Sequence, residues 1–201
     1  MPYPEAVQQM EAVRDRRIAG EIPDTLLLVE HEPVYTVGRT RGAEANILNP
    51  LGVPIVKVAR GGDVTFHGPG QIVGYPIFAL PPHRQDLHGF MRGLEEMMIQ
   101  TLARYGVVGE RDSRNTGVWV SGAKVMAIGI GAKRWVTWHG FALNVDTDLA
   151  HYARINPCGM SSTLVTRLSD HIDPIPGRAE LKAVIVDELR DWWEAWTAPV
   201  G

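Results

Sequence analysis

Hydrophobic residues recur every three or four positions in three segments of the chain, the spacing of an amphipathic helix. The pattern is clearest in the middle segment, which is followed by Gly106, a residue that favours the end of a helix. The first segment has fewer apolar positions and ends before Gly20. The predicted helices cover residues 4–18, 87–102 and 181–196.

Short runs of apolar and β-branched residues, bounded by proline, glycine or asparagine, predict strands between these helices. The last two predicted strands are separated by little more than a tight turn, which is typical of antiparallel neighbours. Strands that arrive in groups favour an α+β fold with a mixed, mostly antiparallel sheet and flanking helices. The predicted strands cover residues 25–30, 34–37, 53–58, 71–80, 118–120, 124–132 and 134–145.

Composition indicates one globular domain over residues 1–201, of which 45% are hydrophobic. A chain of this size buries roughly 70% of its unfolded surface, so it needs no disulfide or metal to fold. The net charge of −3 lacks the basic excess of a nucleic-acid-binding protein. No apolar run approaches the ~20 residues of a membrane span, and the first residues lack a signal-peptide pattern. With a single cysteine, these features predict a cytoplasmic protein with no membrane or nucleic-acid partner.

Glycine and polar residues are densest in the segment 60–71, RGGDVTFHGPGQ. Such a segment lets the backbone approach a ligand closely, although a glycine-rich turn between two strands has the same composition. It contains neither GxGxxG nor GxxxxGK[ST], so it is not a phosphate-binding loop. Within it, Arg60 is a candidate for binding a carbonyl or an anion, and His67 for an acid, a base or a pocket wall.

Cys158 and Lys124 are the candidate reactive side chains. Cys158 lies between proline and glycine, a sequence that presents a side chain at a turn, whereas an inert buried cysteine is the alternative. A thiol attacks only as the thiolate, which needs a nearby cation or base. Lys124 begins a strand with small residues at 127, 129 and 131, which would leave room for an acyl chain. It is either a solvated lysine or, beside a desolvated pocket, the partner of the thiolate.

No serine occupies a GxSxG motif, and no His, Cys, Asp or Glu cluster has metal-ligand spacing, so we expect no metal. From the residues alone, acyl transfer through a thioester is one candidate chemistry among others.

Four motifs together resemble the lipoyl(octanoyl) transferases, in the same order and at similar spacing. They are RGGDVTFHGPGQ (60–71), TGVWVSGAKVMAIG (116–129), WVTWHGFALNV (135–145) and NPCG (156–159). The segment PDTLLLVEHEPVYTVGR (23–39) is similar to the early part of that family. The resemblance implies an α+β fold shared with biotin and lipoate protein ligases, and transfer of an octanoyl group from octanoyl-acyl carrier protein to a lysine of a lipoyl domain. Two rival classes stay open, namely an ATP-dependent lipoate or biotin protein ligase and a non-catalytic protein that binds acyl chains or their carrier. Cys158 in NPCG argues against the ligase, and the presence of both Cys158 and Lys124 argues against the non-catalytic protein.

Carried over position by position, the resemblance implies that Cys158 forms the acyl thioester and that Lys124 activates it. No cofactor is expected, because the thioester donor supplies the free energy. The implied acceptors are the lipoyl domains of 2-oxoacid dehydrogenase complexes and the glycine cleavage H protein. The implied acyl-binding walls are Arg60, Gly61, Gly62, Asp63, Val64, Thr65, Phe66, His67, Ala127, Ile128, Gly129, Gly140, Phe141 and Ala142.

Two positions depart from the family pattern. After NPCG the chain continues with Met160 and three hydroxyl residues, where members of the family often have an aromatic residue, and Asp63 occupies a position that is usually uncharged. An acidic carrier protein would require basic residues near the motifs. Arg111, Arg114, Lys133 and Arg134 are candidates, and ordinary solvated charges are the alternative.

Overall fold

Two β-sheets form the centre of the molecule in the computed structural model, which describes residues 1–156 and 162–199. In the larger sheet, with strand order β1-β5-β8-β7-β6, all neighbouring strands are antiparallel. The smaller sheet has the order β3-β2-β4, and only its β2 and β3 are parallel. The strands are β1 (Thr25–Val29), β2 (Val34–Val37), β3 (Ile55–Lys57), β4 (Val64–His67), β5 (Gln71–Ile77), β6 (Gly117–Val120), β7 (Ala123–Lys133) and β8 (Val136–Asn144).

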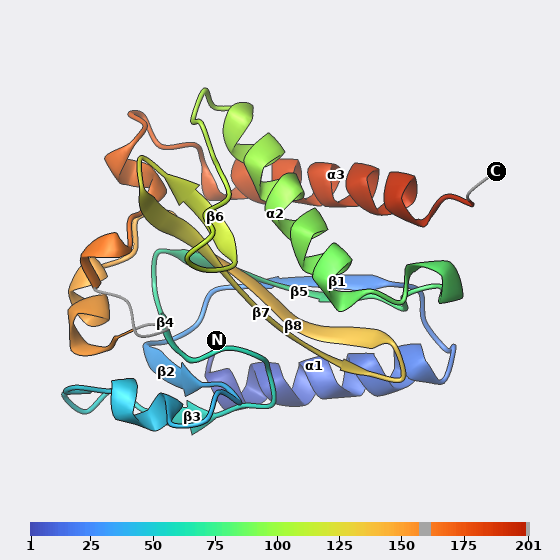
Figure 1. Ribbon diagram of the computed structural model, residues 1–201, viewed down its shortest axis with the longest axis horizontal. Helices are drawn as coiled ribbons and strands as arrows, with labels where there is room; N and C mark the ends of the chain where they lie inside the picture. Colours follow the sequence, from blue (N-terminus) through green and yellow to red (C-terminus); the bar gives the residue numbers. More distant parts are fainter. Residues whose placement is uncertain (157–161, 200–201) are drawn as a thin grey trace.

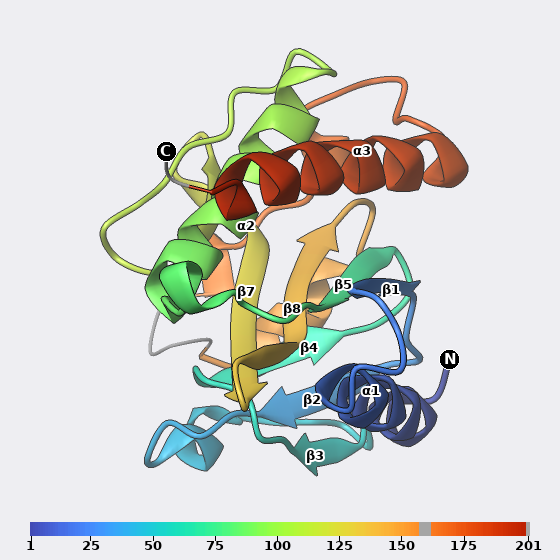
Figure 2. The ribbon, with the colours of Figure 1, turned by 90° about the vertical axis from the view of Figure 1, so that its right-hand side faces the viewer.

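Helices cover both faces of the larger sheet, which confirms the predicted α+β fold. Figures 1 and 2 show α2 (Leu87–Ala103) and α3 (Arg178–Thr197) on one face, and α1 (Tyr3–Ile18) with the smaller sheet on the other. No helix within the described residues is both long and apolar enough to cross a membrane. Short 3₁₀ helices lie at Ala43–Asn46, Pro82–Arg84, Leu149–Arg154, Ser162–Leu164 and Leu168–Asp170.

Each layer has its own apolar cluster. The largest lies between the sheet and α2 and α3, and it buries the methionines of α2, which are therefore core residues. A second cluster, around Met10 and Tyr75, joins α1 to β5 and β8. The third, around Tyr35 and Phe66, packs on the smaller sheet. A cavity lies between β4 and the larger sheet.

The hairpin that joins β7 to β8 is built on a two-residue turn. Arg134 and Trp135 have φ angles of 52° and 61°, and the flanking Lys133 and Val136 are paired. Two left-handed residues match the twist of the flanking strands. This geometry confirms that the two predicted strands are antiparallel neighbours.

The glycine-rich segment 60–71 is only partly a loop. Residues Val64–His67 form β4, which pairs antiparallel with β2 and carries the buried Phe66. The strand escapes prediction because it has four residues and glycines on both sides. Its pairing places the segment on the smaller sheet, opposite β7 of the larger one.

Candidate active site

A cavity between β4 and the larger sheet brings together residues from three of the motifs, 60–71, 116–129 and 135–145. Lys124 is part of its lining, together with Asn115 and Val165. Most of the positions that the resemblance implies for the acyl walls also line it. These are Arg60, Gly62, Asp63, Val64, Thr65, His67, Ala127, Ile128, Gly129, Gly140, Phe141 and Ala142.

Gly61 and Phe66 do not line this cavity. The backbone N–H of Gly61 donates to the carbonyl of Ile130 over 2.8 Å, which ties the glycine-rich segment to β7. The ring of Phe66 is 1% exposed and stacks on His151, with ring centres 4.2 Å apart. Both residues are therefore next to lining residues in the sequence but do not face the cavity themselves.

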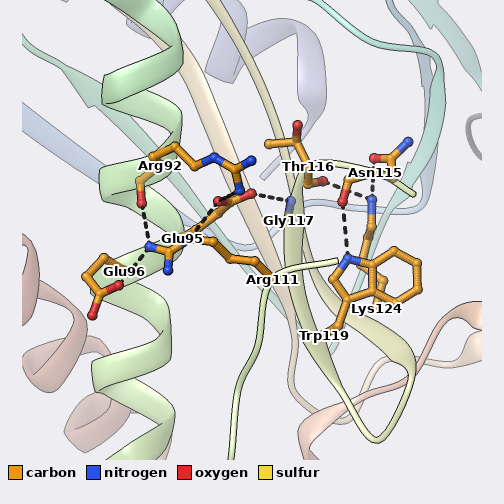
Figure 3. Close-up of polar contacts among 9 residues, drawn as sticks. All are labelled: Arg92, Glu95, Glu96, Arg111, Asn115, Thr116, Gly117, Trp119 and Lys124. Atoms are coloured by element: carbon orange, nitrogen blue, oxygen red, sulfur yellow. Dashed lines mark hydrogen bonds and ion pairs between the residues drawn. The ribbon is translucent and has the colours of Figure 1, made fainter. Parts of the chain in front are cut away.

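Lys124 is buried in a cradle of acceptors, with 7% of its surface exposed. Its Nζ donates to Oδ1 of Asn115 over 2.5 Å and to the carbonyl of Thr116 over 2.9 Å (Figure 3). The same Nζ lies 5.2 Å from the centre of the Trp119 ring, a distance that allows cation–π attraction. The structure therefore excludes the alternative of a solvated lysine at the end of a strand.

Cys158 lies outside the described residues, as do Met160 and the rest of 157–161. The described chain on either side reaches two different parts of the molecule. Before the segment, the N–H of Asn156 donates to the carbonyl of Asn46 over 2.8 Å. After it, Val165 forms a parallel β-bridge with Lys124, and the N–H of Thr166 donates to the carbonyl of Lys124 over 2.9 Å. The chain that follows the NPCG motif thus returns to the lysine.

Histidine and tyrosine side chains surround another part of the cavity. Tyr3 and His67 stack with ring centres 5.9 Å apart, and Nε2 of His31 lies 2.7 Å from the hydroxyl of Tyr75. Burial lowers the pKa of His67 and of His139 to about 3, helped by His31 for the former and by Arg60 for the latter. Burial likewise lowers the pKa of His31 to about 4. These histidines are therefore neutral at neutral pH.

The hydrogen-bond network assigns the tautomer of His67. Nε2 of Gln71 donates to Oδ1 of Asn144 and to the carbonyl of Phe66, so the Oε1 of Gln71 is an acceptor. Nδ1 of His67 donates to this Oε1 over 2.7 Å. Because the ring is neutral, its Nε2 carries a lone pair. This geometry fixes the tautomer, and we assign His67 no role in proton transfer.

The two glycines of β7 also make room for protein side chains, and Gly129 is part of the cavity lining. A Cβ at Gly129 would lie 2.9 Å from Cδ of Arg60. A Cβ at Gly131 would lie 2.5 Å from Nε1 of Trp138, and Gly131 is not part of the cavity lining. Arg60 is held there because its Nη2 donates to the carbonyl and Oγ1 of Thr36. Arg60 and Gly129 both line the cavity.

Asp63 is buried and is satisfied within the protein, although the family position is usually uncharged. Its Oδ1 accepts from the N–H of Val64 and its Oδ2 from Nδ2 of Asn46, each over 2.6 Å. The carboxylate therefore braces β4. Among the described residues, no three His, Cys, Asp or Glu side chains are grouped closely enough to hold a metal ion.

The four candidate carrier-binding residues fall into two groups. Arg111 and Arg114 are paired with nearby carboxylates, those of Glu95 and Glu96 and that of Asp112. Lys133 and Arg134 lie at the opposite end of β7 from Lys124, about 30 Å along the strand at its usual rise per residue. They do not flank the lysine.

The fold is similar to that of the lipoate and biotin protein ligases. Lipoate-protein ligase A bound with ATP superposes with a TM-score of 0.75 at 15% sequence identity, covering 93% of this chain and 81% of that one. The biotin protein ligase from Aquifex aeolicus, in complex with biotin and ATP, superposes with a TM-score of 0.55 at 11% identity, covering 82% and 71%. These likenesses confirm the implied fold.

Sequence comparison identifies the family of the chain. It belongs to the lipoyl protein ligase A/B catalytic domain family, whose model matches residues 2–190. The octanoyltransferase of Geobacter metallireducens is 51% identical over 159 residues, which cover 79% of this chain and 74% of that protein. The octanoyltransferase of Rubrobacter xylanophilus is 49% identical over 198 residues, which cover 94% and 88%. The resemblance to the lipoyl(octanoyl) transferases is confirmed.

Proposed function

We propose that this protein transfers an octanoyl group from octanoyl-acyl carrier protein, through a thioester on Cys158, to a lysine of a lipoyl domain. Residues 1–201 would form one catalytic domain for the first step of endogenous protein lipoylation. The observation that carries the proposal is the cavity, since most of the implied acyl-wall positions line it together with the buried Lys124. Identity to octanoyltransferases supports the same reaction.

In the first half-reaction, the thiolate of Cys158 attacks the thioester carbonyl of the donor. A new C–S bond forms to Cys158, and the C–S bond to the carrier breaks. The proton removed from the Cys158 thiol goes to the departing carrier thiolate, so the carrier leaves as a free thiol. Exchange of one thioester for another is nearly balanced in free energy, which makes the acyl-enzyme accessible without ATP.

In the second half-reaction, the amine of the acceptor lysine attacks the thioester on Cys158. A C–N bond forms and the C–S bond to Cys158 breaks, which restores the thiol. The amine must lose a proton as it becomes an amide, and this proton returns to the Cys158 sulfur. Amide formation from a thioester is downhill, so this step makes the transfer irreversible.

Lys124 is the group that we assign to both proton movements. As an ammonium ion it stabilises the thiolate, and after giving up a proton it can accept one from the attacking amine. The acceptors at Asn115 and Thr116 fix the direction of its Nζ. A fixed proton carrier serves both half-reactions without having to change its position.

The acyl chain would lie along the small and apolar residues of β7 and β8 that line the cavity. The neutral histidines and tyrosines around the cavity add no net charge that would oppose an apolar ligand.

The implied acceptors are the lipoyl domains of 2-oxoacid dehydrogenase complexes and the H protein. A free thiol nucleophile suits the reducing cytoplasm.

A transfer assay without nucleotide tests this function against the ATP-dependent ligases that share the fold. Purified enzyme is mixed with octanoyl-acyl carrier protein and a lipoyl domain, and the mass of the lipoyl domain is followed. We expect one octanoyl group per lipoyl domain in the absence of ATP. Modification that requires ATP and free octanoate would instead establish a ligase.

A further inference from the structure

Glu95 is a buried charged residue that the proposed reaction does not use. It lies on α2, on the side that faces β6 and β7, and only 1% of its surface is exposed. A carboxylate is rarely buried to this extent unless it is paired and hydrogen-bonded, because leaving water is costly for a charge. Its partners therefore indicate why the charge is kept at this position.

Three donors satisfy the Glu95 carboxylate (Figure 3). Oε2 accepts from Nη1 of Arg92 over 2.9 Å and from Nε of Arg111 over 3.1 Å. Oε1 accepts from the backbone N–H of Gly117 over 2.9 Å. The two arginines balance the charge and hold one oxygen, while the other oxygen is directed at a single peptide group.

That peptide group is the one that holds Lys124. The N–H of Gly117 and the carbonyl of Thr116 belong to the same planar unit and point in opposite directions in a trans peptide. Glu95 accepts from its N–H, and the carbonyl accepts from Nζ of Lys124 over 2.9 Å. A carboxylate on one side of a peptide also polarises it, which strengthens the carbonyl as an acceptor.

Hydrogen bonds with Glu95 and Trp119 hold the backbone of the segment 115–117. Gly117 has a φ of 139°, which is strained for other residues, and a Cβ there would lie 3.3 Å from Cε of Lys124. On the other side of Thr116, the carbonyl of Asn115 accepts from Nε1 of Trp119 over 3.2 Å. The segment 115–117 is thus fixed at both ends, by Trp119 and by Glu95.

We propose that Glu95 is a positioning residue for Lys124, which it acts on through the Thr116–Gly117 peptide. Arg92 and Arg111 hold Glu95 in place, and Glu95 fixes the peptide plane whose carbonyl directs the lysine Nζ. The effect of Glu95 on catalysis rests on the proposed function, because it presupposes that Lys124 takes part in octanoyl transfer. The positioning of Lys124 itself can be measured without octanoyl transfer.

The measurement is the labelling of Lys124 by acetic anhydride across a range of pH, quantified by peptide mass spectrometry relative to the exposed Lys133 in the same digest. Glu95→Leu removes the acceptor for the Gly117 N–H. Because the lysine loses its fixed cradle, we expect labelling relative to Lys133 to rise by about tenfold and the pH midpoint to shift. Leu189→Ala, which removes a buried side chain of α3, is the control for lost stability and should leave the ratio unchanged.

Glu95→Gln provides the second variant if Glu95→Leu does not fold. It keeps an oxygen for the Gly117 N–H but presents its NH₂ group to two arginine donors, so we expect a smaller rise of about threefold. In octanoyl transfer, both variants should lower kcat and leave KM nearly unchanged, since the substrate cavity stays intact. Glu188→Gln, which removes a carboxylate of α3 that pairs with Arg104 just after the end of α2, should change neither quantity.

An unchanged ratio of Lys124 to Lys133 labelling and an unchanged pH profile in folded Glu95 variants would overturn the proposal. Changed labelling in Glu95→Leu, together with a wild-type enzyme that transfers no octanoyl group, would support the positioning of Lys124 and overturn the proposed function. The two claims can therefore fail separately.

Discussion

Gly129 on β7 lies directly against the side chain of Arg60, and a Cβ at this glycine would come within 2.9 Å of Cδ and 3.3 Å of Nη1 of that arginine. The carbonyl of Gly61 would lie 3.1 Å away on the same side. Arg60 is fixed in turn by Thr36. Any side chain at position 129 therefore displaces Arg60 and the glycine-rich segment, and Arg60 is part of the cavity lining.

Gly129→Val should narrow the cavity and impair octanoyl transfer more than transfer of a shorter acyl group. A mismatch of one methylene in an apolar pocket is worth about 1–3 kcal/mol of transition-state binding, so we expect a loss of about tenfold or more in kcat/KM with the octanoyl donor. The measurement compares octanoyl and butanoyl donors. Gly177→Ala, where a Cβ meets no atom within 4 Å, is the matched control. An equal loss for both chain lengths would contradict narrowing and indicate a general defect in folding.

Lys124→Arg separates the charge of Lys124 from its action as a base. Arginine keeps the positive charge and cannot be deprotonated at neutral pH. We expect acylation of Cys158 to fall and transfer to the lipoyl domain to fall further, because the attacking amine must lose a proton. Single-turnover kinetics of each half-reaction give the two rates. Wild-type rates in both half-reactions would show that Lys124 is not a base.

The pairing of Lys124 with Cys158 has its own test, the rate of Cys158 alkylation as a function of pH. A cation beside the thiol stabilises the thiolate, so removing it in Lys124→Ala should move the profile to higher pH. The same profile in the variant and the wild type would mean that the two side chains are not coupled.

Three buried histidines make the folded state sensitive to acid. Burial depresses the pKa of His31 to about 4 and of His67 and His139 to about 3, so between pH 6.5 and these values the unfolded chain binds protons that the folded chain does not. The contribution of these histidines to the free energy of unfolding is therefore fully present above pH 6.5 and is lost as the pH falls. From pH 7.5 to 5.5 the loss is about 1.4 kcal/mol for each histidine, or about 4 kcal/mol in all.

Urea unfolding at pH 7.5 and 5.5 measures this loss. His31→Gln removes one of the three groups, so the difference between the two pH values should shrink by about 1.4 kcal/mol. His83 is exposed to solvent in a 3₁₀ helix, and His83→Gln is the matched control that should leave the difference as it is. Stability that is equal at both pH values, or greater at pH 5.5, would contradict the neutral histidine cluster.

The fold was predictable where a single local pattern decides the structure. The helix that became α2 has an apolar residue on every turn, and the hairpin of β7 and β8 needs only two residues between its strands. β4 was missed because its four residues lie between glycines, and its burial comes from β2, which lies far away in the sequence.

Candidate site residues were predictable to the extent that they belong to motifs. Lys124 and most of the implied wall positions line one cavity, but the sequence does not show what fills the space beside a glycine, so Arg60 and Trp138 were not foreseen there. Glu95 gave no signal because a glutamate on an amphipathic helix is usually solvated. Its partners Arg111 and Gly117 are 16 and 22 residues away, and only the folded chain brings them together.

The intact mass of the enzyme after incubation with octanoyl-acyl carrier protein, in the absence of nucleotide and acceptor, tests the central claim most directly. We expect the wild type to gain one octanoyl group, located on Cys158 by peptide mapping and released by hydroxylamine or by a lipoyl domain. Cys158→Ser should gain none, because an alcohol is a far weaker nucleophile than a thiolate without a stronger base. An unmodified wild type that still transfers octanoyl groups, or near-wild-type turnover by Cys158→Ser, would contradict the thioester mechanism.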